Sequence, residues 1–209
     1  MMTVFAVPPF DPKKGSVQNS QNRQYQRFKD DTFIFPVVPS LFLTMLLTEP
    51  NQEVILVDCV AEKLNDVEFG RIIVDMKPDY IVFEANTMIV KRYYEVINGL
   101  KEHLPQIKLI LCGEHGTAMP DEVKANCKAD YFLRGGKWYY EAYKIIMGKE
   151  WPKDKQLPHI NRDAARWYNY AYNNGNFKRT PATYTMFAQD CWYRPKHLDG
   201  SSKACTFCT

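Results

Sequence analysis

Short apolar runs alternate with amphipathic helical stretches over the first 147 residues, and this alternation constrains the fold more than any other feature. Five runs bounded by turn residues are expected to be buried strands. They are residues 3–7, 53–58, 79–84, 108–112 and 130–133. Between them, apolar residues recur at helical spacing, as in Val90, Tyr93 and Ile97. Because parallel strands need long crossovers, usually helical, the pattern predicts a five-stranded parallel sheet covered by helices on both faces.

Two strand orders fit such an α/β sheet, and we expect the flavodoxin-like (Rossmann-like) one. In either order a ligand binds outside the carboxyl ends of the strands, where the strand order reverses. Small and polar residues gather in the loops that follow the expected strands. They are Thr87, Gly113, Gly116, Thr117, Gly135 and Gly136. The sequence therefore predicts a ligand site formed by these loops.

Changes in composition divide the chain into three expected parts. Residues 1–148 form the α/β domain, since Gly148 closes the last helical pattern. Residues 149–182 are a connector that is broken by prolines and asparagines, yet is rich in Trp and Tyr. Aromatic side chains at that density should pack on another surface, so we expect a strap across the first domain rather than a free linker. Residues 183–209 begin with an apolar run that predicts one more strand.

Charge and hydropathy limit the partners of the chain. The formal net charge of +3 is too small to indicate a polyanionic partner. No apolar run approaches the roughly 20 residues of a membrane helix, and the N-terminal residues lack the basic and apolar regions of a secretory signal. We therefore expect a cytoplasmic protein that binds small-molecule cofactors, and neither a membrane nor nucleic acid.

The six cysteines fall into two groups. Three of them, Cys59, Cys112 and Cys127, stand singly in apolar or mixed segments, as buried reduced thiols do. The other three, which crowd the C-terminal end, are Cys191, Cys205 and Cys208. Without an export signal, clustered cysteines indicate metal or redox chemistry more than disulfides. Four thiolates close a four-iron cluster, so three leave one iron without a protein ligand.

This C-terminal segment resembles the cluster loop of the radical S-adenosylmethionine (radical SAM) family, in which Cys-x3-Cys-x-aromatic-Cys follows the first barrel strand. The resemblance implies that Cys191, Cys205 and Cys208 ligate a [4Fe-4S] cluster, and that Phe207 lies beside the adenine of S-adenosyl-L-methionine. It also implies that this cofactor chelates the open iron and is cleaved to a 5′-deoxyadenosyl radical. Thirteen residues separate Cys191 from Cys205, where the family pattern has three.

Zinc is the alternative metal for this segment. His197 lies between Cys191 and Cys205, and tetrahedral zinc accepts one histidine with three cysteines. A closed zinc site would make the tail structural and would favour a nucleic-acid-associated protein. The expected strand before Cys191, the aromatic Phe207 and the upstream α/β domain favour the cluster.

The first domain resembles the cobalamin-binding domain that precedes such barrels. Residues 113–120 (GEHGTAMP) are similar to the family's Gly-Gly-Pro-His-x-Thr-x-x-Pro loop, and residues 134–136 (RGG) to its Arg-Gly-Glu-Gly-Glu turn. Two prolines also follow the first expected strand, as in the family. The resemblance implies a set of cobalamin-binding residues in these loops. They are Pro8, Pro9, Thr87, Gly113, Glu114, His115, Thr117, Arg134, Gly135 and Gly136.

The chemistry of a corrin ring suits these residue types. A broad, partly apolar disc edged with amides needs small residues for close backbone approach, and hydrogen-bonding groups on several loops. The chain has no Asp-x-His-x-x-Gly motif, whose histidine is the lower axial ligand of cobalt in another cobalamin class. His115 is the candidate substitute, although a hydrogen bond within its own loop is the simpler role. No Gly-x-Gly-x-x-Gly or Walker motif indicates a nucleotide instead.

Together these features predict the N-terminal part of a cobalamin-dependent radical SAM enzyme, whose cofactors are cobalamin, a [4Fe-4S] cluster and S-adenosyl-L-methionine. Such enzymes typically transfer a methyl group. Only the first barrel strand is expected within the 209 residues. We therefore expect the remaining barrel on a downstream segment or a separate catalytic chain, and no catalysis by this chain alone. Two alternatives stay open: a stand-alone cobalamin-binding module, and a zinc-binding protein associated with nucleic acid.

Overall fold

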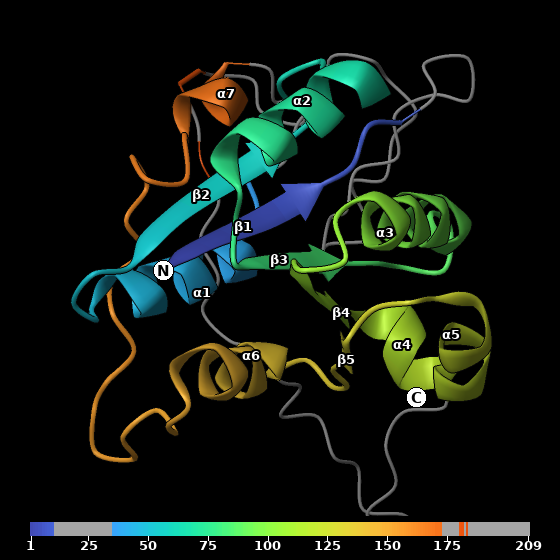
Figure 1. Ribbon diagram of the computed structural model, residues 1–209. Helices are drawn as coiled ribbons and strands as arrows, with labels where there is room; N and C mark the ends of the chain where they lie inside the picture. The colour runs from blue at the N-terminus through green and yellow to red at the C-terminus, as the bar shows by residue number, and fades with distance from the viewer. Residues whose placement is uncertain (11–34, 173–179, 182, 184–209) are drawn as a thin grey trace, which may run out of the picture.

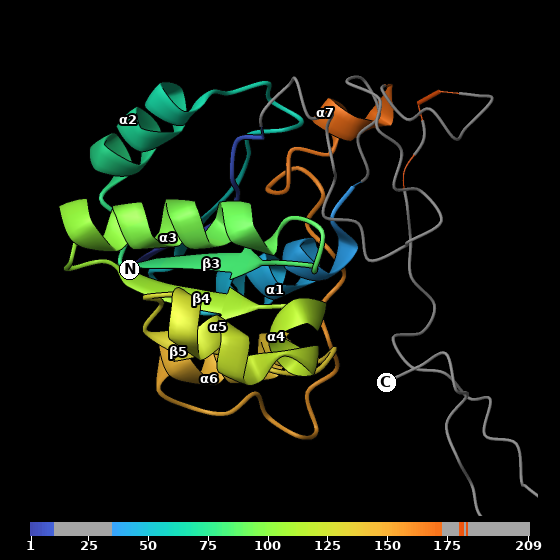
Figure 2. The same ribbon diagram turned by 90° about the vertical axis from the view of Figure 1, so that its right-hand side faces the viewer.

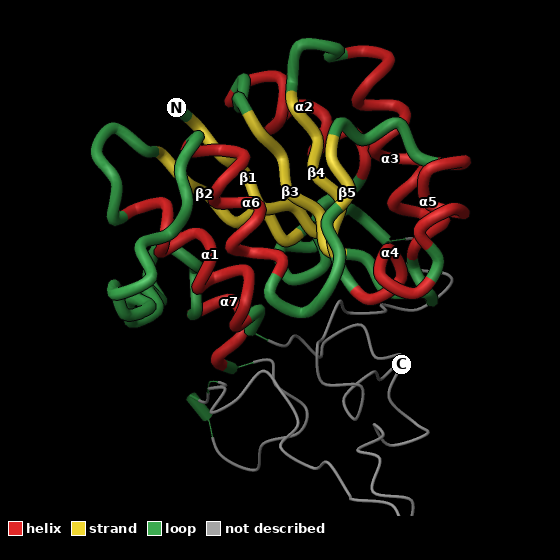
Figure 3. Tube along the Cα trace, turned by 90° about the horizontal axis from the view of Figure 1, so that it is seen from below, coloured by secondary structure: helices red, strands yellow, loops and turns green. Residues whose placement is uncertain are grey.

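A computed structural model describes residues 1–10, 35–172, 180, 181 and 183. All five expected strands are present. They are β1 (Met2–Val7), β2 (Glu53–Asp58), β3 (Tyr80–Glu84), β4 (Lys108–Cys112) and β5 (Tyr131–Phe132). Neighbouring strands are parallel and follow the order β2-β1-β3-β4-β5, as Figure 3 shows across the sheet. The expected α/β class with a five-stranded parallel sheet is confirmed, and this strand order occurs in flavodoxin-like folds.

Helices cover both faces of the sheet (Figure 1). On one face lie α1 (Val37–Leu47) and α6 (Trp138–Met147). On the other face lie α2 (Asp66–Met76), α3 (Val90–His103) and α5 (Pro120–Asn126). Two short helices, α4 (Glu114–Ala118) and α7 (Tyr168–Ala171), complete the described elements. Within the described part of the chain, no helix combines the length and the apolar character needed to cross a bilayer.

Alternation along the strands builds two apolar cores. Phe5 and Val82 point toward α1 and α6, where they are fully buried. Val4 and Ile81 point to the opposite face and are buried against α2 and α3. A parallel strand that is covered on both faces must be apolar at nearly every position, which explains why the strands appear in the sequence as continuous apolar runs.

The ends of the helices follow local signals in the sequence. The Asn65 side chain accepts the N–H groups of Val67 and Glu68, and the Glu68 side chain accepts the N–H of Asn65, which makes a complete capping box. The same helix ends at Lys77, which has a left-handed φ of 48°, one residue before Pro78.

Two elements differ from the expectation. The short helix α4 was not expected at all. Strand β5 contains only Tyr131 and Phe132. It pairs with β4 alone and forms an edge of the sheet, so few ladder bonds define its length. The strand expected after residue 183, and the barrel that it would open, lie outside the described residues.

Residues 149–172, here called the strap, pack on the face of the sheet that carries α1 and α6. Trp151 and Tyr170 are buried in the same core cluster as these helices. The Trp151 ring meets Tyr143 edge to face, with 5.2 Å between ring centroids. The expectation that these aromatic residues pack on the first domain is confirmed for both.

Polar contacts fasten the strap along its length. The Lys149 ammonium lies 2.7 Å from the Glu49 carboxylate, at the end of α1. Further along, the Asn161 N–H donates to Thr44 Oγ1 at 2.9 Å. Near the end of the strap, the Arg166 guanidinium lies 2.7 Å from the Glu62 carboxylate. The strap therefore runs from the C-terminal end of α6 to the turn that follows β2.

Candidate functional site

Parallel pairing places the carboxyl ends of all five strands at one edge of the sheet, here called the carboxyl edge. In Figure 2 the arrows of β3 and β4 end on the same side of the molecule, at this edge. The cofactor-binding residues predicted in the α/β domain all lie in the segments that directly follow β1, β3, β4 and β5, and three of them, Glu114, His115 and Thr117, belong to the short helix α4. The fold therefore brings together short segments that are far apart in the sequence. These residues differ in how exposed they are to solvent. The buried or partly buried ones are here called the inner group, and the exposed ones the outer group.

Gly113 belongs to the inner group, because backbone and not ligand occupies the space beside it. Its φ of 111° is left-handed, and a Cβ atom there would lie 2.4 Å from the carbonyl oxygen of Ala85. The loops after β3 and β4 are joined at this point, since the Ala85 N–H donates to the Cys112 carbonyl at 2.9 Å. Only glycine fits this contact.

His115 is also enclosed. Its side chain is almost fully buried, with 2% of the residue exposed. Nδ1 lies 3.2 Å from the Thr87 hydroxyl, in the neighbouring loop. Nε2 lies 3.5 Å from a carboxylate oxygen of Glu122, without the geometry of a hydrogen bond. Both ring nitrogens therefore face protein groups, and His115 ties two loops together.

Pro8 and Pro9 are buried at the end of β1. The Pro9 carbonyl accepts the Nε–H of Arg92, from α3, at 3.0 Å. The Arg92 guanidinium also pairs with Asp66, at the start of α2. The two prolines therefore shape the start of the loop after β1 and hold it against two helices.

Thr117 connects the loops after β4 and β5. Its hydroxyl donates to the Gly113 carbonyl at 3.0 Å and accepts the Gly135 N–H at 2.8 Å. An Arg134 guanidinium nitrogen reaches the Thr117 carbonyl at 3.4 Å. Because this hydroxyl both donates and accepts a hydrogen bond within the protein, Thr117 positions the Gly135 turn.

The outer group lies at the surface of the protein. Thr87, Glu114 and Arg134 are exposed, and so are the two glycines that follow Arg134. Gly135 has a left-handed φ of 80°, and no atom lies within 4 Å of a Cβ built on Gly135 or Gly136. A large ligand can therefore approach the backbone closely at this turn.

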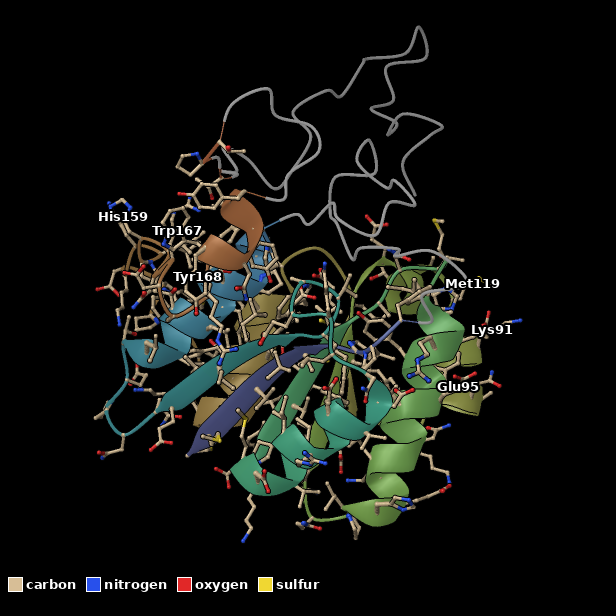
Figure 4. The ribbon with its side chains drawn as sticks, turned by 90° about the horizontal axis from the view of Figure 1, so that it is seen from above. Lys91, Glu95, Met119, His159, Trp167 and Tyr168 are labelled. Atoms are coloured by element: carbon tan, nitrogen blue, oxygen red, sulfur yellow. The ribbon has the colours of Figure 1, made fainter. Side chains whose placement is uncertain are left out.

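Exposed apolar side chains border the same edge. Met88 and Met119, in the loops after β3 and α4, expose 54% and 49% of their surface. Figure 4 shows Met119 at one end of the edge, near α3, and Trp167 and Tyr168 at the other end, where Tyr168 begins α7. These flexible or flat side chains suit contact with a partly apolar molecule.

Two buried carboxylates at the carboxyl edge were not predicted from the sequence. Asp58 ends β2 and Glu84 ends β3, on either side of β1. The Glu84 carboxylate accepts the indole N–H of Trp138 at 3.0 Å. One Asp58 oxygen accepts the N–H groups of Val60 and Ala61, both at 3.0 Å. The sequence signal that could have revealed them is a charged residue at the end of an apolar strand.

Tyr170 brings the strap to Asp58. Its hydroxyl donates to Asp58 Oδ2 at 2.8 Å, inside the core. Burial raises the pKa of Asp58 to about 6, although the Ala61 N–H and the Tyr170 hydroxyl both favour the ionised form. Burial, together with the nearby Asp58 carboxyl, raises the pKa of Tyr170 well above its ordinary value, so the phenol remains the donor.

The predicted metal ligands Cys191, Cys205 and Cys208, the adjacent Phe207 and the alternative ligand His197 lie outside the described residues. Among the described residues, no group of three or more metal-binding side chains is placed to hold an ion. The three isolated thiols, Cys59, Cys112 and Cys127, are buried and unpaired, as expected. Burial raises the pKa of each of them, so they remain thiols.

Comparisons with protein-family models, with curated proteins and with solved structures found no match to this chain.

The glycine contact between the loops after β3 and β4 is testable by substitution. We expect Gly113→Ala to lower the free energy of unfolding by about 3 kcal/mol or more, because the methyl group meets the Ala85 backbone at a left-handed φ. Gly136→Ala should change it by no more than about 0.5 kcal/mol, since the space there is open. Urea denaturation measures both. Equal losses would show that the loop contact is absent.

Asp58 gives a pH-dependent contribution to stability. Its pKa of about 6 lies above the unfolded value of 3.8, so the folded chain holds the proton more tightly. That stabilisation is present below about pH 4 and is lost as the pH rises through about 6. We expect the stability of the wild type, relative to Asp58→Asn, to fall by about 2 to 3 kcal/mol over this range.

Denaturation at a series of pH values tests this expectation. Both proteins contain the carboxyl groups whose pKa is lowered, such as Glu49 and Asp130. The contribution of these groups therefore cancels in the difference between the two unfolding free energies. Val74→Ala, an exposed change on α2 that involves no titratable group, should run parallel to the wild type. If Asp58→Asn also runs parallel, Asp58 titrates normally in the folded protein.

Proposed function

We propose that this chain binds cobalamin at the carboxyl edge, as the N-terminal part of a cobalamin-dependent radical SAM enzyme. The strongest support is the open turn at Gly135 and Gly136, which lies at the same edge of the sheet as the exposed Thr87 and the exposed Met119. These groups offer close backbone approach, a hydroxyl and an apolar contact, which are the features that a corrin needs. The strand order supports the same location, because ligands of such sheets bind beside the β1–β3 switch point.

The exposure of each predicted residue narrows the set of residues that we propose to contact cobalamin. Thr87, Glu114, Arg134, Gly135 and Gly136 are exposed at the edge and are assigned to direct contact. The other predicted residues support this outer group from beneath. They are Pro8, Pro9, Gly113, His115 and Thr117. His115 is enclosed by Thr87 and Glu122 and is therefore not assigned as a ligand of cobalt.

The C-terminal cysteines belong to the second half of the proposal. Cys191, Cys205 and Cys208 would hold a [4Fe-4S] cluster, with Phe207 beside S-adenosyl-L-methionine. Bound together, the three cofactors would supply radical chemistry and methyl transfer. The described residues would form the surface that binds the corrin at the carboxyl edge. The strap fixes the place where the chain leaves the sheet, at Tyr170.

Cobalamin binding is tested by titrating hydroxocobalamin into the full chain and following the visible spectrum of the corrin. Gly136→Trp places a large side chain in the open space at the turn, and we expect binding at least about tenfold weaker. Gly99→Trp is the matched control, because that glycine also has open space but lies on α3, toward the opposite edge of the sheet. Tight binding by both variants, or binding by neither them nor the wild type, would contradict the proposed site.

The cluster is tested separately by anaerobic reconstitution with iron and sulfide. We expect the broad visible absorbance of thiolate-bound iron, and its loss in Cys205→Ser and Cys208→Ser. Cys127→Ser, which alters an isolated buried thiol, should retain the cluster. Corrin binding without iron would favour a stand-alone cobalamin module. Stoichiometric zinc without iron, with RNA binding that weakens with salt, would favour the zinc alternative.

A further inference from the structure

Three side chains at the carboxyl edge follow one another as hydroxyl, imidazole and carboxylate. They are Thr87, in the loop after β3, His115, in α4, and Glu122, in α5. His115 Nδ1 lies 3.2 Å from the Thr87 hydroxyl oxygen, and Nε2 lies 3.5 Å from a Glu122 carboxylate oxygen. This is the order of groups that activates a hydroxyl nucleophile for acyl transfer.

The exposure of the three residues also suits a nucleophile. Thr87 lies at the surface, where a substrate reaches it, whereas only 2% of His115 is exposed. The His115 ring meets the ring of Tyr94 edge to face, with 6.5 Å between centroids. Glu122 is partly exposed on the other side of the imidazole. The base is therefore held in place and shielded from water, next to a hydroxyl at the surface.

A role in tying two loops accounts for one side of the His115 ring but not for the other. Nδ1 meets the Thr87 hydroxyl, whereas Nε2 is buried and has no hydrogen-bond partner among the described residues. An unpaired buried polar atom is costly, and it is a recurring feature of catalytic sites. The imidazole adds one chemical property to the loop contact, which is the ability to accept the Thr87 proton.

The Glu122 carboxylate selects the tautomer that this property requires. A carboxylate attracts an N–H and repels a lone pair, so it favours the ring proton on Nε2. Nδ1 then carries the lone pair and accepts the hydrogen bond of the Thr87 hydroxyl, as a general base does. When His115 takes up the proton, the negative charge 3.5 Å away stabilises the imidazolium.

Two exposed methionines indicate the class of substrate. Met88 directly follows Thr87 in the chain. Met119, labelled in Figure 4, follows α4, and its N–H donates to the His115 carbonyl at 2.8 Å. Both expose about half of their surface, at 54% and 49%. Flexible thioether side chains adapt to apolar groups of different shape, so they suit the apolar acyl group of an ester.

We propose that Thr87, His115 and Glu122 form an ester-cleaving site for activated esters or thioesters with an apolar acyl group. Thr87 is the nucleophile and His115 the general base and acid, whereas Glu122 is a positioning residue that acts through His115. The site uses only side chains of this chain. Because Thr87 is also assigned to contact with the corrin, ester cleavage belongs to the chain without corrin. Each activity is measured without the other, so either can fail alone.

The reaction balances in two steps. The Thr87 oxygen attacks the carbonyl carbon of the ester, and its proton passes to His115 Nδ1. The bond to the leaving oxygen or sulfur breaks and that atom takes the proton from His115, which leaves an acyl ester on Thr87. A water molecule then gives a proton to Nδ1 and attacks the acyl carbon. The Thr87 oxygen leaves, regains a proton from His115, and a carboxylic acid is released.

The test uses the full chain and p-nitrophenyl butyrate, without cobalamin. We expect a burst of p-nitrophenol equal in amount to the protein, followed by slower turnover, and one butyryl group on the peptide that contains Thr87. Thr87→Ala should abolish the burst and lower the rate at least about a hundredfold, whereas Thr87→Ser should retain the burst and the adduct. His115→Gln should slow acylation by about a hundredfold or more.

Glu122→Gln tests the positioning role, because it removes the charge and keeps the shape. We expect kcat to fall about tenfold with KM and the thermal midpoint unchanged, since the carboxylate acts on the imidazolium and not on the bound ester. A role in packing alone would move the thermal midpoint and leave kcat in place. A wild-type kcat in Glu122→Gln would remove the carboxylate from the site.

Controls separate this site from the general reactivity of p-nitrophenyl esters. Thr48→Ala and His103→Gln alter an exposed hydroxyl and an exposed imidazole near the C-terminal ends of α1 and α3, and both should leave the burst unchanged. Thiols also react with such esters, and the three isolated thiols are buried. The other three are therefore changed to serine together, and the burst should persist. They are Cys191, Cys205 and Cys208.

Thr87 is exposed, so its variants keep the test valid if His115→Gln proves unstable. A wild-type rate in Thr87→Ala overturns the proposal, and so does a butyryl group that is found only on other residues. Unchanged acylation of Thr87 in a folded His115→Gln protein also overturns it, because the hydroxyl then reacts without the base.

Discussion

Parallel pairing is the constraint on which the whole arrangement depends. Each strand must be followed by a helix that returns the chain to the opposite edge, so every loop after a strand begins at the same edge. In this protein that geometry gathers Thr87, the Gly113 turn and the Gly135 turn within one surface. The cores on both faces use nearly all the strand residues, which leaves the loops as the place where polar and small residues can serve a ligand.

Contacts within the protein hold the described loops of the carboxyl edge together. Gly113 allows two loops to touch through their backbones, His115 connects the same loops through Thr87, and Thr117 holds the next turn. A surface that is fixed before a ligand arrives loses less conformational entropy on binding. The open glycine turn therefore rests on an ordered base, and residues that never touch a ligand can still decide how well it fits.

The sequence predicted the frame of the fold better than the interior of the site. The boundaries of β2 and β4 follow directly from apolar runs that end at polar or turn residues. Gly113 was predicted as a point of close approach, but the approaching group is the Ala85 carbonyl and not a cofactor. The Glu84–Trp138 and Asp58–Tyr170 pairs join residues 54 and 112 positions apart, and no periodic pattern encodes such contacts. They arise only when strands, α6 and the strap assemble.

The strap also determines what the smallest autonomous folding unit is. Trp151, Ala165 and Tyr170 supply part of the core on the α1 and α6 side, and Lys149 and Tyr170 satisfy the charges of Glu49 and Asp58. Trimming the chain at Gly148 would expose this part of the core to water and leave Glu49 and Asp58 without these counterparts. Shortened versions for crystallography or spectroscopy therefore need to extend through Ala171, even though the last helix on the sheet ends at Met147.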